Sequence, residues 1–160
     1  MPLEVLPGPP PPIGGCLFAR SWPSRIDHKQ EVLDILVAEL LGRGFITAEE
    51  EPWAVLVLDE VVVNAMLHGN EGDPTLSVVI ALFADDTGRW VMTVRDQGQG
   101  FDPASLPDPE DPASLLLEHG RGIRIMKEWL ADLVYYERGA CAWLARQRAD
   151  RPIAAPPESP

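Results

Sequence analysis

Three short segments that carry Asn, Asp or Gly interrupt a chain that is otherwise rich in apolar residues. They are Glu60-Val-Val-Val-Asn64-Ala-Met-Leu-His68-Gly69, Asp96-Gln-Gly98-Gln-Gly100-Phe101 and His119-Gly120-Arg121-Gly122-Ile123. A polar pair one helical turn apart on an apolar helix, followed by two glycine-rich turns after later elements, is the layout of a nucleotide site. The fold is therefore expected to bring one helix face and two later turns to the same place.

The first segment lies on a stretch from Trp53 to Leu67 that is almost entirely apolar, which predicts a helix buried on most sides. Glu60 and Asn64 are one turn apart, so they lie on one face about 5–6 Å from each other. A buried carboxylate needs a partner, and carboxylate and amide oxygens are ligands that Mg²⁺ accepts alongside water and phosphate. For this helix alone, an exposed polar stripe on its surface is the simpler interpretation. The glycines downstream favour the site.

The second segment follows residues 89–95, which are β-branched and aromatic enough to predict a strand that ends at Asp96. Gly98 and Gly100 allow positive φ angles and a close approach of the backbone to a ligand. Asp96 could accept a hydrogen bond from an exocyclic amine such as that of adenine. The alternative is a plain turn, since Asp, Gln and Gly are common turn residues.

The third segment, Gly120-Arg121-Gly122, precedes residues 123–131, whose apolar positions have helical spacing. A helix that opens on glycines offers free N–H groups and its dipole to a phosphate. Alone, this segment equally predicts a hinge before a core helix. The three segments together are specific for a nucleotide site.

In their order and spacing, the three segments resemble the N-box and the two glycine boxes of the GHKL ATPases, which have the Bergerat fold. Residues 16–147 are most similar to the anti-sigma factor serine/threonine kinases of bacteria. This closer similarity rests on the short chain, on Glu60 at the head of the N-box, and on the Gly-Arg-Gly-Ile...Met-Lys-Glu...Asp-Leu-Val run. A sensor histidine kinase would carry an upstream dimerisation helix with its phosphoacceptor histidine, and a gyrase or chaperone relative would be far longer.

The resemblance implies a role for each matching residue. Glu60 would be the catalytic general base toward a serine or threonine hydroxyl, Asn64 would ligate Mg²⁺, and Asp96 would receive the adenine amine. The nucleotide-binding residues implied in this way are Asn64, Asp96, Gly98, Gly100, Gly120, Arg121 and Gly122. Residues 102–118 would form the lid over ATP, with an ordinary surface loop as the alternative.

The implied function is that of an ATP-dependent protein serine/threonine kinase and anti-sigma factor. Such proteins bind a sigma factor in one state and phosphorylate a STAS-domain antagonist in another, and many are homodimers. The alternative is a binding module that uses ATP to switch partners without phosphorylating anything. Glu118-His119 stand where some members carry an arginine that helps manage the γ-phosphate, so this chain supports nucleotide binding more directly than transfer. A histidine-kinase type of phosphotransfer lacks a candidate phosphoacceptor, since His28 lies on the first predicted helix.

Composition narrows the class of protein further. The net charge of −12 argues against direct binding of nucleic acid, which needs a basic face. The chain has no charged-then-apolar leader and no apolar run near the roughly 20 residues that span a bilayer, so we expect a cytoplasmic protein. Cys16 and Cys141 lack metal or redox spacing and are predicted to be buried thiols.

The expected fold is α+β, a two-layer α/β sandwich with helices on one face of a mixed, mostly antiparallel sheet. We expect a strand at 16–21, a helix at 26–41, and two hairpins at 75–96 and 132–146. Thr47 and Glu50 predict a capping box before a helix that begins near Glu51 or Pro52. The proline-rich segments 1–15 and 148–160 are expected to be extended or disordered tails around an ATPase domain at 16–147.

Overall fold

The computed structural model describes residues 4–100 and 128–149. The predicted lid at 102–118 and the predicted phosphate segment Gly120-Arg121-Gly122 lie outside these residues. The main elements are β1 (Glu4–Val5), β2 (Gly15–Pro23), α1 (Lys29–Gly42), α2 (Glu51–Val63), β3 (Ser77–Ala84), β4 (Arg89–Arg95), β5 (Asp132–Tyr136) and β6 (Cys141–Gln147). Short turns of helix lie at Ile26–His28, Ala48–Glu50, Asn64–Gly69 and Glu137–Gly139.

The strands in the described part of the chain form one six-stranded sheet in the order β1-β5-β6-β4-β3-β2. Among the described residues, β1 and β5 run parallel and every other neighbouring pair is antiparallel. Two of the antiparallel pairs are the predicted hairpins, β3 with β4 and β5 with β6. The predicted mixed, mostly antiparallel sheet is confirmed.

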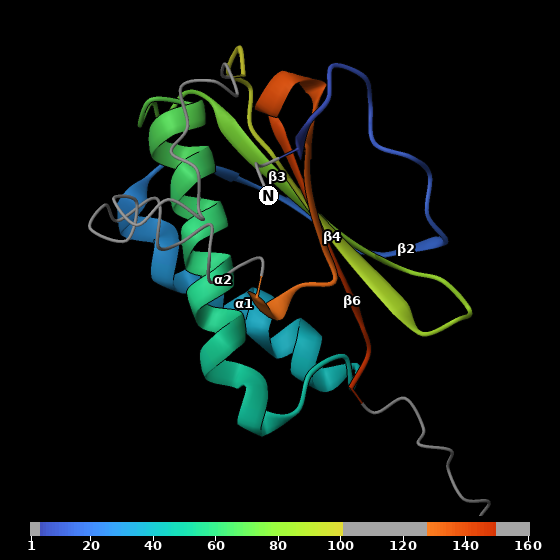
Figure 1. Cartoon of the computed structure of the whole chain (residues 1–160). Helices are drawn as coiled ribbons and strands as arrows, with labels where there is room; N and C mark the ends of the chain where they lie inside the picture. Colours follow the sequence, from blue (N-terminus) through green and yellow to red (C-terminus); the bar gives the residue numbers. More distant parts are fainter. Residues whose placement is uncertain (1–3, 101–127, 150–160) are drawn as a thin grey trace, which may run out of the picture.

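Helices α1 and α2 lie together on one side of this sheet (Figure 1). A single apolar core joins both helices to the inner face of the strands, with side chains such as Leu36, Leu58, Ile80, Met92 and Leu144 fully buried. A smaller cluster around Val91 and Trp143 covers part of the opposite face. The alternation of the two clusters along β4 and β6 follows from the period of two in a strand. The chain is the two-layer α+β sandwich that its sequence predicts.

The start of α2 is as predicted. The Thr47 hydroxyl accepts a hydrogen bond from the Glu50 backbone N–H at 3.3 Å, and Glu50 Oε1 accepts one from the Thr47 N–H at 3.0 Å. This reciprocal pair is the capping box, and the α-helix begins at Glu51 with Pro52 in its first turn.

The expectation that this helix is buried on most sides is wrong. Trp53 and Leu56 are 42% and 52% exposed, and Leu67 is 40% exposed. In a two-layer fold a helix packs one face on the sheet, and its other face meets solvent even where the side chains are apolar. The strongly apolar sequence therefore overstated the burial.

The segment that follows α2 changes its hydrogen-bond pattern. Residues Asn64–Gly69 form a π-helix, and the Asn70 N–H bonds to the Ala65 carbonyl at 2.9 Å, five residues back. Turns of this kind are rare and occur often at functional sites, because they re-aim the side chains at one end of a helix. Here the change begins at Asn64.

The N-terminal proline-rich segment contains a strand that the sequence analysis did not anticipate. Residues 4 and 5 pair with β5, and the backbone continues along the same edge, with the Leu6 N–H bonded to the Tyr135 carbonyl at 2.8 Å. The carbonyls of Leu6 and Gly8 then accept hydrogen bonds from Arg138 and Glu137 in the β5–β6 turn, each at 2.9 Å. The segment is extended as predicted, but residues 4–8 are held by backbone pairing instead of being disordered.

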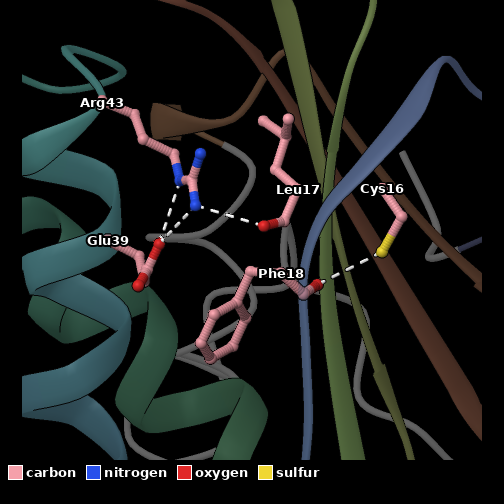
Figure 2. A network of polar contacts seen from close by, with 5 residues as sticks. All are labelled: Cys16, Leu17, Phe18, Glu39 and Arg43. Carbon is pink, nitrogen blue, oxygen red and sulfur yellow. Dashed lines mark hydrogen bonds and ion pairs between the residues drawn. The ribbon is translucent and has the colours of Figure 1, made fainter.

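The opposite edge of the sheet is β2, which carries a bulge at Leu17 between Cys16 and Phe18. Figure 2 shows how Arg43, just after α1, reaches this bulge: its guanidinium donates to the Leu17 carbonyl at 3.1 Å and to Glu39 at 2.9 Å. Cys16 is exposed and its thiol donates to the Phe18 carbonyl at 3.5 Å, which corrects the prediction of a buried thiol. An edge strand leaves one side without neighbours, and that is why Cys16 is reached by solvent. Cys141, on the interior strand β6, is buried as predicted.

Within the described parts of the chain, no helix combines the length and the apolar character that crossing a bilayer requires.

Candidate functional site

Glu60 and Asn64 are both half-buried at the C-terminal end of α2, where the π-helix begins. The side chain of Asn64 hydrogen-bonds the hydroxyl of Tyr135, a residue of β5 that is buried. The pKa of Tyr135 is raised to about 12, chiefly by burial and also by the negative charges of Glu60 and Asp96, while the hydrogen bond to Asn64 lowers it in part. Asn64 therefore contacts the buried hydroxyl, and the charges of Glu60 and Asp96 are near enough to act on it.

Asp96 stands directly after β4, as predicted, and is only 9% exposed. Its backbone N–H bonds to the Ala140 carbonyl at 2.8 Å, and its Oδ1 accepts a hydrogen bond from the Gly98 N–H at 2.8 Å. The pKa of this carboxyl is raised to about 6, chiefly by burial and also by the charge of Glu137, while the hydrogen bond from Gly98 lowers it in part. A buried carboxylate with a perturbed pKa is typical of functional sites.

The glycines around Asp96 are needed because backbone segments touch there. A Cβ placed on Gly69 would lie 2.1 Å from Asp96 Oδ2, and one placed on Gly98 would lie 2.1 Å from the Gly69 carbonyl oxygen. Gly100 has a positive φ of 82°, and its Cβ would lie 2.0 Å from the Arg138 carbonyl oxygen. The first and second sequence segments are thus in direct contact through positions that have no side chain. The contribution of Gly98 and Gly100 to a nucleotide pocket stays a prediction.

Asn70 is a residue of this region that the sequence analysis missed. It is 1% exposed and makes three side-chain hydrogen bonds, to the Ser24 hydroxyl at 2.6 Å, the Ser77 carbonyl at 3.0 Å and the Gln97 N–H at 2.7 Å. The signal in the sequence was an amide directly after His68-Gly69, at the end of the helix. Gly69 and Tyr135 were also missed, and both contact predicted site residues.

The predicted magnesium ligand is compatible with this arrangement. No group of three or more His, Cys, Asp or Glu able to hold a metal occurs in residues 4–100 and 128–149. Mg²⁺ bound with a nucleotide needs few protein ligands, because water and phosphate oxygens complete its octahedral shell. The Asn64 amide, steadied by Tyr135 and one turn after Glu60, offers one hard oxygen of the required kind.

The comparison with protein families gives a match over most of the chain. The family of the histidine kinase-like ATPase domain matches residues 22–146, a range that includes all three sequence segments.

Several similar proteins are anti-sigma F factors. That of Heyndrickxia coagulans is 32% identical over 103 residues, which cover 62% of this chain and 69% of that protein. That of Anoxybacillus flavithermus is 27% identical over 123 residues, covering 72% of this chain and 80% of the relative. That of Geobacillus thermodenitrificans is 30% identical over 104 residues, covering 62% and 69%.

The family match spans more than half of the chain, and the described fold and motif order agree with it. An ATPase domain implies that ATP is the nucleotide bound. The chain belongs to the histidine kinase-like ATPase family, the GHKL class of ATP-using proteins.

Proposed function

We propose that this protein is an ATP-dependent anti-sigma regulator with serine/threonine kinase activity toward a STAS-domain antagonist. The observation that carries the proposal is the hydrogen bond of Asn64 to the buried Tyr135 hydroxyl, on which the charges of both Glu60 and Asp96 also act. The names of the similar proteins support a sigma factor as one partner. The antagonist, a homodimeric assembly and a cytoplasmic location rest on the family resemblance.

In this proposal Asp96 accepts a hydrogen bond from the adenine amine and Asn64 offers its amide oxygen to Mg²⁺. Magnesium, when bound, neutralises the charge of the phosphates. Gly120, Arg121 and Gly122 would face the phosphates from the opening of the next helix, as their sequence predicts.

Glu60 is the group that acts on the protein substrate. It takes the proton of a serine or threonine hydroxyl as the hydroxyl oxygen bonds to the γ-phosphorus and the bond to ADP breaks. Phosphoryl transfer depends chiefly on positioning and charge stabilisation. One carboxylate in contact with the incoming hydroxyl is therefore enough to serve as the general base. Its half-buried place at the end of α2 leaves it accessible from one side.

The decisive experiment is affinity capture from the source cell, with and without Mg·ATP, followed by mapping of phosphorylated residues on the captured proteins. The proposal expects a sigma factor and a small STAS protein, with phosphate on a serine or threonine of the latter. Glu60→Gln is the matched control, since it removes the base but keeps the size of the side chain. Capture that depends on ATP but gives no phosphate, with wild type and variant alike, would favour the alternative of a partner-switching module without transfer.

A further inference from the structure

Three residues from separate parts of the chain form a closed ring of hydrogen bonds beside Asp96. The Asn70 amide nitrogen donates to the Ser77 carbonyl at 3.0 Å, the Ser77 N–H donates to Gln97 Oε1 at 2.5 Å, and the Gln97 N–H donates to Asn70 Oδ1 at 2.7 Å. Asn70 follows the π-helix, Ser77 begins β3, and Gln97 follows Asp96. The ring therefore ties the end of the helix layer to two strands.

The orientation of the Asn70 amide is fixed by its partners. The Ser77 carbonyl can only accept a hydrogen bond and the Gln97 N–H can only donate one, so exchanging the oxygen and nitrogen of Asn70 would lose both bonds. The second hydrogen of the amide nitrogen goes to the Ser24 hydroxyl at 2.6 Å. Asn70 is only 1% exposed, so bulk solvent has little access to its amide, and leaving the amide without these partners would be costly.

The ring lies directly beside the contact between Gly69 and Asp96. Asn70 and Gln97 are the residues directly after Gly69 and Asp96, the pair whose backbone and carboxylate touch. The hydrogen bond between Asn70 and Gln97 thus fixes the two chain segments just beyond that contact. The carboxylate itself receives a hydrogen bond from Gly98, on the other side of Gln97.

We infer that Asn70 and Gln97 are positioning residues that hold the Asp96 carboxylate where it can select an amino-purine over an oxo-purine. This inference rests on the proposed role of Asp96 toward adenine. ATP offers an amine at the 6-position of its base and an acceptor at N1, whereas ITP carries a carbonyl oxygen at the 6-position and a hydrogen on N1. A carboxylate that is fixed in place accepts a hydrogen bond from the amine and repels the oxygen. A carboxylate that can move discriminates less between the two bases.

The test measures the affinities of Mg·ATP and Mg·ITP by calorimetry, and the ratio of the two is the readout. Asn70→Ala removes two of the three ring bonds and should lower the preference for ATP by about tenfold. Gln97→Ala removes only the bond from the Ser77 N–H and should lower the preference by about threefold. Gln97 is exposed, so Gln97→Ala is expected to fold even if Asn70→Ala does not. Gln97→Glu keeps an acceptor for the Ser77 N–H and should retain the preference.

Ser24→Ala is the matched control. It removes the same 2.6 Å bond to Asn70 that Asn70→Ala removes, but it leaves the ring and Gln97 intact. It should lower the melting temperature without changing the ATP to ITP ratio. A merely structural role of Asn70 would make Ser24→Ala and Asn70→Ala alike in the ratio.

The outcomes separate this inference from the proposed function. If the wild type prefers ATP, Asp96→Asn abolishes the preference, and the folded ring variants keep it, the inference is overturned and the role of Asp96 stands. If the wild type has no preference for ATP, or Asp96→Asn retains it, the adenine assignment fails and the inference fails with it.

Discussion

The Cα of Gly69 packs directly against the carboxylate of Asp96, because a Cβ there would lie 2.1 Å from Oδ2 and 2.3 Å from Cγ. Gly69 is the last residue of the π-helix, and Asp96 is the first residue after β4. One residue of the helix layer and one of the sheet therefore meet without an intervening side chain. Any side chain at position 69 must displace the carboxylate that is proposed to read adenine.

Gly69→Ala is expected to weaken ATP binding by about tenfold or more, because the added methyl group forces Asp96 to move, an overpacking cost of about 1–3 kcal/mol. Calorimetry with Mg·ATP measures this. Gly42→Ala is the control, since a Cβ at Gly42 meets nothing within 4 Å and should leave affinity unchanged. Equal affinities in the two variants would contradict a close-contact role for Gly69.

Asp96→Asn is expected to weaken ATP binding at neutral pH, because an amide is a poorer and partly mismatched acceptor for the adenine amine. The difference from wild type should shrink as the pH falls through about 6, where the wild-type carboxyl takes up its proton. Titrations of both proteins at several pH values test this, and the variant corrects for protonation of ATP itself. A difference that stays constant with pH would argue against an ionised Asp96 in binding.

The same carboxyl should make the stability of the nucleotide-free protein depend on pH. Its pKa of about 6 in the folded protein lies above the ordinary value of 3.8, so between these values the folded state holds a proton that the unfolded state has lost. The contribution of Asp96 to the free energy of unfolding is therefore greatest at low pH and falls as the pH rises through this window. Urea denaturation should show that the free energy of unfolding falls between pH 5 and pH 7 in the wild type. The fall should be smaller in Asp96→Asn, which has no carboxyl group at this position.

The sequence predicted the elements whose cause is local. Strands and hairpins followed from β-branched and aromatic residues bounded by turn residues, and the capping box followed from the spacing of Thr47 and Glu50. These elements were placed within a few residues of their observed bounds. Asp96 was placed at a strand end for the same reason. The binding and catalytic roles of the site residues are still predictions; these residues are Glu60, Asn64, Asp96, Gly98 and Gly100.

The features that the sequence did not predict depend on partners far along the chain. Asn70 is held by Ser24, Ser77 and Gln97, which come from three other segments, and no short pattern marks such a set. The pairing of residues 4–5 with β5 spans almost the whole described chain, and proline-rich composition concealed it. The burial of the outer face of α2 was predicted wrongly, because burial depends on which other elements pack against a helix. The sequence of the helix alone does not reveal those elements.

Glu60→Gln is expected to keep ATP affinity within about twofold and to slow phosphoryl transfer by about 10²–10⁴-fold, the usual contribution of a general base. The glutamine preserves the size of the side chain at the end of α2 but cannot take a proton. Calorimetry measures binding, and transfer of labelled phosphate from ATP to the captured antagonist measures activity. Transfer at the wild-type rate in Glu60→Gln would remove Glu60 from the proposed chemistry.

The capping box before α2 gives a prediction about the helix that carries Glu60. Thr47→Ala removes the acceptor of the Glu50 N–H and should cost about 1 kcal/mol of unfolding free energy, as for other N-caps, while Thr47→Ser keeps the hydroxyl and serves as the control.

Glu50→Ala should cost more, about 2 kcal/mol, since Glu50 both completes the box and pairs through Oε2 with Arg146 on β6 at 2.6 Å. Both partners of that pair are only about one-fifth exposed, so solvent screens it less than a surface pair. Chemical denaturation of Thr47→Ala, Glu50→Ala and the double variant measures the coupling free energy between the two residues. Because both residues share the box, the double variant should be less destabilised than the sum of the two single variants, whereas strict additivity would mean that the two hydrogen bonds act independently.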